Sequence, residues 1–129
     1  MIFNLDEHTI ENISLGKETM FKDGPHEITS YAFGVKNKKI HYISVRLGEF
    51  YSQGPLFNGL LVLNGKKLQA NKNLQPEDIK PHLPKPASHW NDGTEVNYQF
   101  IKDNVRLEFS WNLAESGLIP NYIALENED

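Results

Sequence analysis

Two patterned runs in the C-terminal half constrain this chain more than any other feature. Apolar and polar residues alternate strictly over 96–100 and again over 105–111, and the polar turn 102–104 joins the two runs. Side chains of a β-strand point alternately to its two faces, so this pattern predicts an antiparallel hairpin with one buried, aromatic-rich face. The residues expected on the opposite, water-facing side are Asn97, Gln99, Arg106, Glu108 and Ser110.

Further strand signals lie in the first half of the chain. Residues 40–47 also alternate, which predicts a strand with Ile43, Val45 and Leu47 on one face and Tyr42, Ser44 and Arg46 on the other. Asn64-Gly65 predicts a tight hairpin between 60–63 and 66–69, because both residues tolerate the positive φ angles of a type I′ turn. A strand is expected through 28–33, whereas 10–15 fits either a short helix or an irregular lead-in.

Helical signals are confined to one short segment. Pro76, followed by Glu77 and Asp78, predicts a helix start, and the prolines beyond it keep the helix short. A last strand is expected around 119–125, followed by an acidic tail. The sequence therefore predicts an α+β fold: one domain, residues 1–129, mainly antiparallel β-sheet with one or two short helices packed on one face.

The size, charge and composition of the chain argue against several classes of protein. A chain of 129 residues without cysteine can bury a core without disulfides, and it offers no thiol to a zinc site. The formal charge of −4 argues against nucleic-acid binding, which needs clustered Lys and Arg. No apolar run approaches the roughly 20 residues that span a bilayer, and Asp6 and Glu7 argue against a secretion signal. We therefore expect a cytoplasmic protein without membrane or nucleic-acid partners.

Candidates for catalysis and metal binding are sparse. The best cluster among the five histidines, His82 and His89 with Asp92, crosses a proline-rich loop and lacks the spacing of a compact zinc motif. A glycosidase-type carboxylate pair could come from Asp92, Glu95, Asp103 and Glu108. Asp92 and Asp103, however, are typical turn residues, and Glu108 alternates onto the wet face of its strand. No serine lies in a nucleophile elbow, and no phosphate or dinucleotide motif is present. We predict no enzymatic activity, no cofactor and no metal.

The two tryptophans differ in their surroundings. Trp111 continues the buried face of 105–109, so we assign it to the core, with its indole N–H bonded to a carbonyl or water. Trp90 lies among polar residues; we favour core packing for it and keep an exposed contact as the alternative. The segment 49–57 contains three aromatic residues. At least two of these are expected to be buried, although an aromatic loop rimmed by acids would also suit protein binding.

The pattern Leu-x-Leu-Asn64-Gly65-Lys66-x-Leu68, the short proline-rich helix, Trp90-x-Asp92-Gly93 and the terminal strands together resemble small bacterial immunity proteins. These are inhibitors encoded beside contact-dependent or type VI secreted toxins. The order of helix and strands also resembles the β-lactamase-inhibitor-protein and BamE-like architecture. The first resemblance implies stoichiometric inhibition of a cognate toxin, which an acidic chain would bind best if the toxin is basic.

Under this hypothesis, aromatic and acidic residues contact the partner. The predicted partner-binding residues are Glu49, Tyr51, Trp90, Asp92, Glu126 and Glu128, with the acidic tail steering association. One alternative is a ligand-binding or enzymatic domain that uses the concave sheet face, with Tyr42, Arg46, Glu108 and His89 as its polar lining. Another alternative is a structural or assembly subunit that forms a homo-oligomer.

Overall fold

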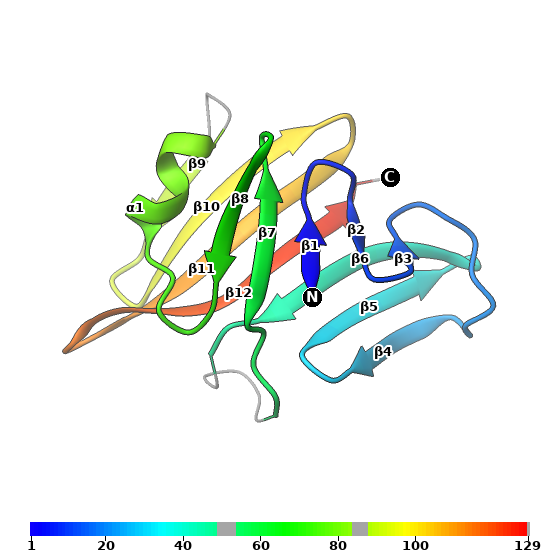
Figure 1. Ribbon diagram of the computed structural model, residues 1–129, viewed down its shortest axis with the longest axis horizontal. Coiled ribbons are helices and arrows are strands. Elements are labelled where there is room, and N and C mark those ends of the chain that lie inside the picture. The colour runs from blue at the N-terminus through cyan, green and yellow to red at the C-terminus, as the bar shows by residue number, and fades with distance from the viewer. Residues whose placement is uncertain (49–53, 84–87, 129) are drawn as a thin grey trace.

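The structure, a computed structural model, describes residues 1–48, 54–83 and 88–128, and its strands form two sheets (Figure 1). The five-stranded sheet has the order β3 (Ile13–Ser14), β2 (Thr9–Ile10), β1 (Ile2–Asn4), β7 (Gly59–Leu63) and β8 (Lys66–Ala70). The seven-stranded sheet has the order β4 (Gly24–Ile28), β5 (Tyr31–Lys36), β6 (Lys39–Arg46), β12 (Gly117–Asn127), β11 (Val105–Ala114), β10 (Glu95–Lys102) and β9 (Ser88–Asn91). A short helix, α1 (Pro76–Ile79), continues into a 3₁₀ turn, η1 (Lys80–His82).

The core lies between the two sheets. Figure 1 shows the five-stranded sheet and α1 on the same side of the seven-stranded sheet. The hydrophobic cluster joins Phe3 and Leu61 of the small sheet with Phe33, Ile43 and Phe109 of the large sheet, and none of these is more than 1% exposed. No described strand or helix covers the other side of the seven-stranded sheet, which we call the open face.

The local signals of the sequence are confirmed where they rest on alternation or turn chemistry. In β6, Ile43 and Val45 are buried in the core, and Ser44 between them faces the other way. The hairpin of β7 and β8 turns at Asn64 and Gly65, with φ angles of 51° and 78°. β10 pairs antiparallel with β11 over the whole predicted hairpin. The prediction of mainly antiparallel sheet with a short helix is therefore correct.

The start of α1 is tied to the large sheet. Pro76 opens the helix as predicted, and the carboxylate of Asp78 accepts a hydrogen bond from the Gln75 backbone N–H at 2.9 Å. The Gln75 side chain donates to the Leu118 carbonyl of β12 at 2.9 Å. The Trp111 indole N–H donates to the carbonyl of Leu74 at 2.8 Å, and this tryptophan is only 1% exposed. The assignment of Trp111 to the core is confirmed.

Several elements differ from their predicted form. The strands divide between two sheets, and β1 pairs in parallel with β7, whose paired residues lie 58 positions further along the chain; local patterning does not encode this pairing. The lead-in at 10–15 consists of the short strands β2 and β3, and the strand expected through 28–33 is the hairpin of β4 and β5. β12 extends to Asn127, so Glu126 belongs to a paired strand and not to a free tail.

Three residues are placed against expectation. Asn97 and Ser110 point to the open face as predicted, but they are buried, at 6% and 1% exposure, because neighbouring side chains cover them. Trp90, for which core packing was favoured, is 50% exposed. It pairs with Asn97 from β9, the edge strand, where no further described strand lies beside it. In the segment 49–57, Phe57 is buried, while Phe50 and Tyr51 lie outside the described residues.

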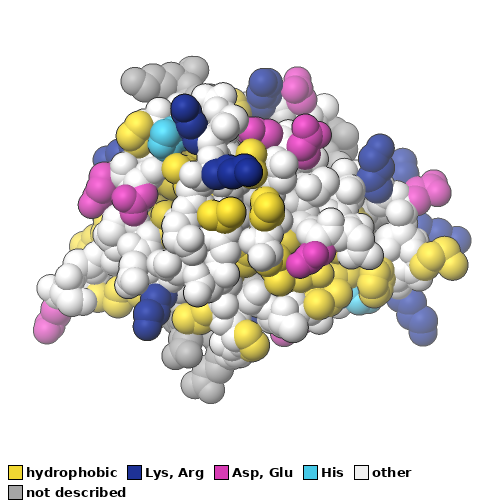
Figure 2. All heavy atoms as spheres, viewed as in Figure 1, with side chains coloured by type: hydrophobic (Ala, Val, Ile, Leu, Met, Phe, Trp, Pro, Cys, Tyr) yellow, Lys and Arg dark blue, Asp and Glu magenta, His cyan; other side chains and the backbone are white. Residues whose placement is uncertain are grey.

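The side of the molecule that carries the small sheet has mixed charge. Figure 2 shows Lys, Arg, Asp and Glu side chains interspersed over this side, with hydrophobic side chains between them. No helix within residues 1–48, 54–83 and 88–128 is long and apolar enough to cross a membrane.

Candidate functional site

The strand register lines up the outward side chains of the seven-stranded sheet in rows across the open face. Directly paired residues on neighbouring strands have side chains on the same face, about 5 Å apart. Two flanking rows are clear: Tyr42 pairs with Glu126, and Arg46 pairs with Tyr122. The row between them contains, strand by strand, Glu27, Ala32, Ser44, Ala124, Glu108 and Gln99.

Three small side chains in the middle row leave a hollow in the open face. Ala32, Ser44 and Ala124 form its floor, because none of these side chains rises far above the sheet. The hollow has a volume of about 390 Å³. Its walls include Glu27, Tyr42, Arg46, Tyr122 and Glu126. The floor residues come from β5, β6 and β12, so the hollow exists only when these strands are in register.

The four large residues at the corners of the hollow are alternately aromatic and charged. Each flanking row lies two residues along the strand from the floor, about 7 Å away. Tyr42 and Arg46 are on β6, while Glu126 and Tyr122 are on β12. The two tyrosines therefore occupy one diagonal of the hollow, and the guanidinium and the carboxylate occupy the other.

Gly34 makes room for the ring of Tyr42. The two residues are paired between β5 and β6, and a Cβ atom on Gly34 would lie 2.0 Å from Cε2 of the ring. The tyrosine ring therefore lies over the glycine. Burial raises the pKa of the Tyr42 hydroxyl, and the charges of Glu27 and Glu126 raise it further. The phenol is consequently protonated at neutral pH and can act as a donor at the edge of the hollow.

Arg46 places a shielded positive charge at its corner. Its side chain is only 13% exposed, and Nη2 lies 3.5 Å from Oε1 of Glu27, whose side chain is 69% exposed. A pair of this length with one exposed partner contributes little to stability. Arg46 lies on β6 at the end of the hollow opposite Glu126.

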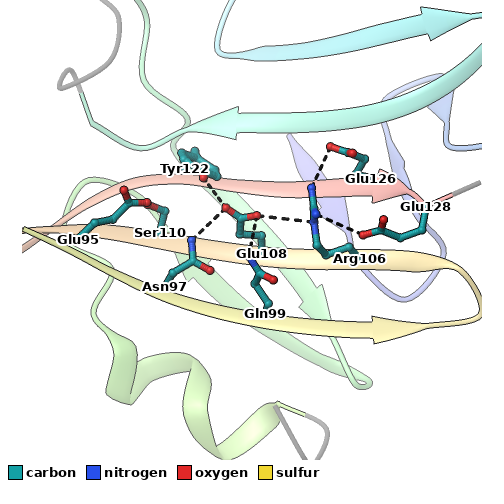
Figure 3. A network of polar contacts seen from close by, with 9 residues as sticks. All are labelled: Glu95, Asn97, Gln99, Arg106, Glu108, Ser110, Tyr122, Glu126 and Glu128. Atoms are coloured by element: carbon teal, nitrogen blue, oxygen red, sulfur yellow. Dashed lines mark hydrogen bonds and ion pairs between the residues drawn. The ribbon is translucent and has the colours of Figure 1, made fainter. Parts of the chain in front are cut away.

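Next to the hollow, the carboxylate of Glu108 collects hydrogen bonds from neighbouring strands (Figure 3). The Tyr122 hydroxyl donates to Oε1, and Asn97 donates to the same oxygen at 3.0 Å. Gln99 donates to Oε2 at 3.4 Å, and Nε of Arg106 lies 3.7 Å from that oxygen. The Glu108 side chain is only 14% exposed, so these donors replace the water that it has lost.

The pKa of the Tyr122 hydroxyl is raised above the ordinary value of 10.0. Burial is the largest cause, followed by the hydrogen bond to Glu108 and the charges of Glu108 and Glu95. The side-chain contact with Ser110 acts in the opposite direction. Tyr122 therefore remains a donor to Glu108 at neutral pH.

Arg106 connects this network to the end of β12. Its Nη2 lies 3.1 Å from Glu126, and its Nη1 lies 3.3 Å from Glu128. Glu126 also borders the hollow, so the hollow and the Glu108 network form one surface. This surface contains five carboxylates and two guanidinium groups, a net charge of −3: Glu27, Glu95, Glu108, Glu126 and Glu128 against Arg46 and Arg106.

Three asparagines lie beneath this surface. Asn97, Asn112 and Asn121 are all more than nine-tenths buried. Asn121 donates to Ser110 at 3.1 Å, and Ser110 donates to Glu95 at 2.8 Å. Within the described part of the chain, Asn97 Oδ1, Asn112 Nδ2 and Asn121 Oδ1 have no hydrogen-bond partner. Buried amides with unused capacity are costly, and they are often satisfied by water or a ligand.

The structure brings three of the predicted partner-binding residues to the open face. Glu126 and Glu128 bind Arg106, and Trp90 lies at the edge of the same face. Asp92 is different: its carboxylate accepts hydrogen bonds from the backbone N–H groups of Thr94 and Glu95 and from the Thr94 hydroxyl, which together lower its pKa. It organises the turn before β10. Glu49 and Tyr51 lie outside the described residues.

Of the four residues named for the alternative, ligand-binding hypothesis, three lie at or beside the hollow and one does not. Tyr42 and Arg46 line the hollow, and Glu108 lies beside it. His89 is placed on the opposite face, because it pairs with Tyr98 and its ring lies 4.7 Å from that core tyrosine. Including His89 in the lining was therefore wrong.

The other half of the hollow was not predicted from the sequence. Tyr122, Ala124 and Glu126 alternate along β12, a signal that was present but unused. A register shift between Ser110 and Trp111 complicates this signal, because it breaks the alternation in β12 near Asn121. Glu27 had no comparable signal, since only the pairing of β4 with β5 brings it to the middle row.

Within the ranges that the structure describes, no three His, Asp or Glu residues are grouped closely enough to hold a metal ion. What the site does offer is a hollow with aromatic and charged walls, beside a hydrogen-bonded acidic surface. No known protein family, no curated protein and no solved structure matches this chain.

Proposed function

We propose that this protein is a non-catalytic binding protein of the toxin-immunity type, which acts in the cytoplasm and neutralises a basic protein by stoichiometric binding through its open face. The observation that carries the proposal is the surface formed by the hollow and the Glu108 network, with a net charge of −3 and two tyrosines at the hollow. Such a surface favours a cationic partner, because complementary potentials accelerate encounter and disfavour wrong partners.

The size of the open face supports a protein partner. Seven strands about 4.8 Å apart span roughly 29 Å, and the eight-residue strand β6 is about 27 Å long. The plan area is therefore on the order of 800 Å², close to the area that each partner buries in a typical stable complex. One face of the sheet is large enough to form the whole interface.

The residue types on this face also suit an interface. Tyrosine, tryptophan and arginine are enriched among the residues that contribute most binding energy. Tyr42, Tyr122 and Arg46 surround the hollow, and Trp90 is exposed at the edge of the face. We expect these side chains to make the central contacts with the partner. The polar and charged residues around them would form the water-accessible rim of the interface.

The test is a comparison of captured partners between two charge-reversal variants. Glu27→Lys/Glu128→Lys changes the open face, whereas the control Glu7→Lys/Glu77→Lys makes the same charge change at exposed positions elsewhere. Tagged wild-type protein and both variants are used to capture partners from a lysate of the source cells. We expect one basic protein, in equimolar amount, with the wild type and the control but not with the open-face variant.

Two results would contradict the proposal. Equal capture by all three proteins would show that the partner binds elsewhere. Capture of the protein's own copies alone would indicate an assembly subunit. In either case, circular dichroism must first show that the variants are folded, because a charge reversal next to the Glu108 network can disturb it.

A second function is favoured by the hollow itself. Its volume of about 390 Å³ lies within the range of small-molecule sites, roughly 300–1,000 Å³. A small ligand that stays bound during purification from the source would be released when the protein is denatured, and it would appear in the mass spectrum of the protein-free extract. The ligand should be lost in Ala124→Leu, which fills the floor, and retained in Ala114→Leu, which lies at the end of β11.

A further inference from the structure

We infer that the hollow receives one arginine side chain of the bound partner, with its guanidinium group beside Tyr42 and Glu126. The inference rests on the proposed function and adds the chemistry of the anchor. The charge of the surface is not its only support, because the inference also depends on the shape of the hollow and on the chemistry of its corners.

The hollow is large enough for a single long side chain. Its floor is three strands wide, about 10 Å, and the flanking rows lie about 14 Å apart. One extended side chain with its backbone amide fits between the rows.

The floor and the walls match the two parts of an arginine. Ala32 and Ala124 offer an apolar floor to the aliphatic stem, whereas the walls carry the carboxylates of Glu27 and Glu126. Arg and Lys side chains bury their apolar stems while the charged end stays among polar groups. The planar guanidinium is less strongly hydrated than an ammonium group and stacks on aromatic rings, which favours arginine at a tyrosine-walled site.

The corner formed by Tyr42 and Glu126 is suited to the guanidinium. These residues are a direct cross-strand pair, so the ring and the carboxylate are neighbours on one face. A guanidinium between them can stack on the ring and donate to the carboxylate. Arg106 already lies 3.1 Å from Glu126, and a carboxylate has about four acceptor positions, so a second guanidinium can bind on the other side.

The opposite end of the hollow sets the direction of the side chain. Arg46 is located there, so the incoming positive charge is repelled from that end and drawn towards Glu126.

The test uses a small probe and does not require the partner. Nα-acetyl-arginine methylamide is titrated into ¹⁵N-labelled protein, and the matched citrulline compound, which has the same shape without the charge, serves as the neutral probe. We expect saturable shifts of the Ala32, Ser44 and Ala124 amides with the arginine probe only. A single side chain without the rest of an interface should bind with a Kd on the order of 1 mM.

Variants locate the charge and the ring. Glu126→Gln should weaken binding of the arginine probe by at least about threefold, and Tyr42→Leu should do the same while retaining apolar bulk. Glu77→Gln, on α1, should leave binding unchanged. Unchanged dispersion of the other resonances shows that each variant is folded. If Glu126→Gln proves to be unfolded, Tyr42→Leu still tests the corner.

Three results would overturn the inference: no shift at the floor residues, equal shifts with the citrulline probe, or shifts that are insensitive to both corner variants. These results are distinguishable from failure of the proposed function. If the arginine probe fails while Glu27→Lys/Glu128→Lys still abolishes capture of the partner, then the open face binds protein but the hollow does not hold an arginine.

Discussion

The hydroxyl of Tyr122 donates a hydrogen bond to the carboxylate of Glu108, and this bond joins β12 to β11 across the open face. The direct partner of Glu108 on β12 is Ala124, so the bond runs diagonally, over two residues of register. Tyr122 is also a wall of the hollow. One phenol therefore connects the hollow to the Glu108 network.

Replacing Tyr122 by Phe should destabilise the protein by about 2 kcal/mol, because the shielded Glu108 carboxylate loses a donor. Urea unfolding measures this change. The matched control is Tyr42→Phe, whose hydroxyl makes no hydrogen bond to any described side chain or backbone group, so its effect should stay within about 0.5 kcal/mol. Similar effects of the two variants would contradict the assigned bond.

The same residue should affect stability at high pH. The pKa of Tyr122 is raised in the folded state, so its contribution to stability is fully present below the ordinary pKa of 10.0 and is lost as the pH rises through the folded value. The free energy of unfolding of the wild type should therefore fall more steeply above pH 10 than that of Tyr122→Phe. Tyr31 and Tyr42, whose pKa values are also raised, are present in both proteins and do not affect the comparison. Parallel curves would refute the prediction.

The two tryptophans should respond oppositely to substitution by Phe. Trp111→Phe removes buried volume and leaves the Leu74 carbonyl without its indole donor, which should cost about 2–3 kcal/mol. Trp90→Phe, at a half-exposed edge position, should cost less than about 1 kcal/mol. Chemical denaturation compares both, and capture of the partner should be impaired only by Trp90→Phe. A large loss of stability in Trp90→Phe would show that this residue packs more tightly than its exposure indicates.

Gly34→Ala should act through Tyr42. The added methyl group would displace the ring that lies over the glycine, and overpacking of this kind costs about 1 kcal/mol or more. In the background of Tyr42→Leu the cost should fall but not vanish, because Cε1 of His41 would still lie 2.9 Å from the added carbon. A double-mutant cycle on the free energy of unfolding measures this change. Additive effects would mean that the glycine serves the backbone of β5 and not the ring.

Asp92→Ala should lower the melting temperature at pH 7, because the carboxylate organises the turn before β10. The hydrogen bonds from Thr94 and Glu95 lower its pKa from the ordinary value of 3.8, so its contribution is present above that pH and disappears as the pH falls through the folded pKa. The difference from the wild type should therefore shrink in acid. Glu115→Ala, in the turn after β11, serves as the control variant. A difference that persists at low pH would indicate a role of Asp92 other than its charge.

The sequence predictions were accurate for features that depend on residues close together in the chain, and less accurate for features that depend on distant strands. Alternation in β6 and β10 and the turn at Asn64 and Gly65 depend on a few neighbouring residues, and all were predicted correctly. The placement of His89 and the exposure of Trp90 were not, because each depends on which strand lies next to β9 and on where the sheet ends. Side-chain alternation indicates two faces but does not say which of them a distant strand will cover.

The sequence by itself determined the strands that alternate clearly, such as β6, β10 and β11, the turn at Asn64 and Gly65, and the apolar face of the C-terminal hairpin. Only the tertiary structure decided that Ala32, Ser44 and Ala124 lie side by side as a floor. Ala32 and Ala124 are more than 90 residues apart in the chain, and their meeting depends on the register of three strands. Register between distant strands is set by the packing of both sheets on a common core, a property of the whole molecule that no local pattern contains.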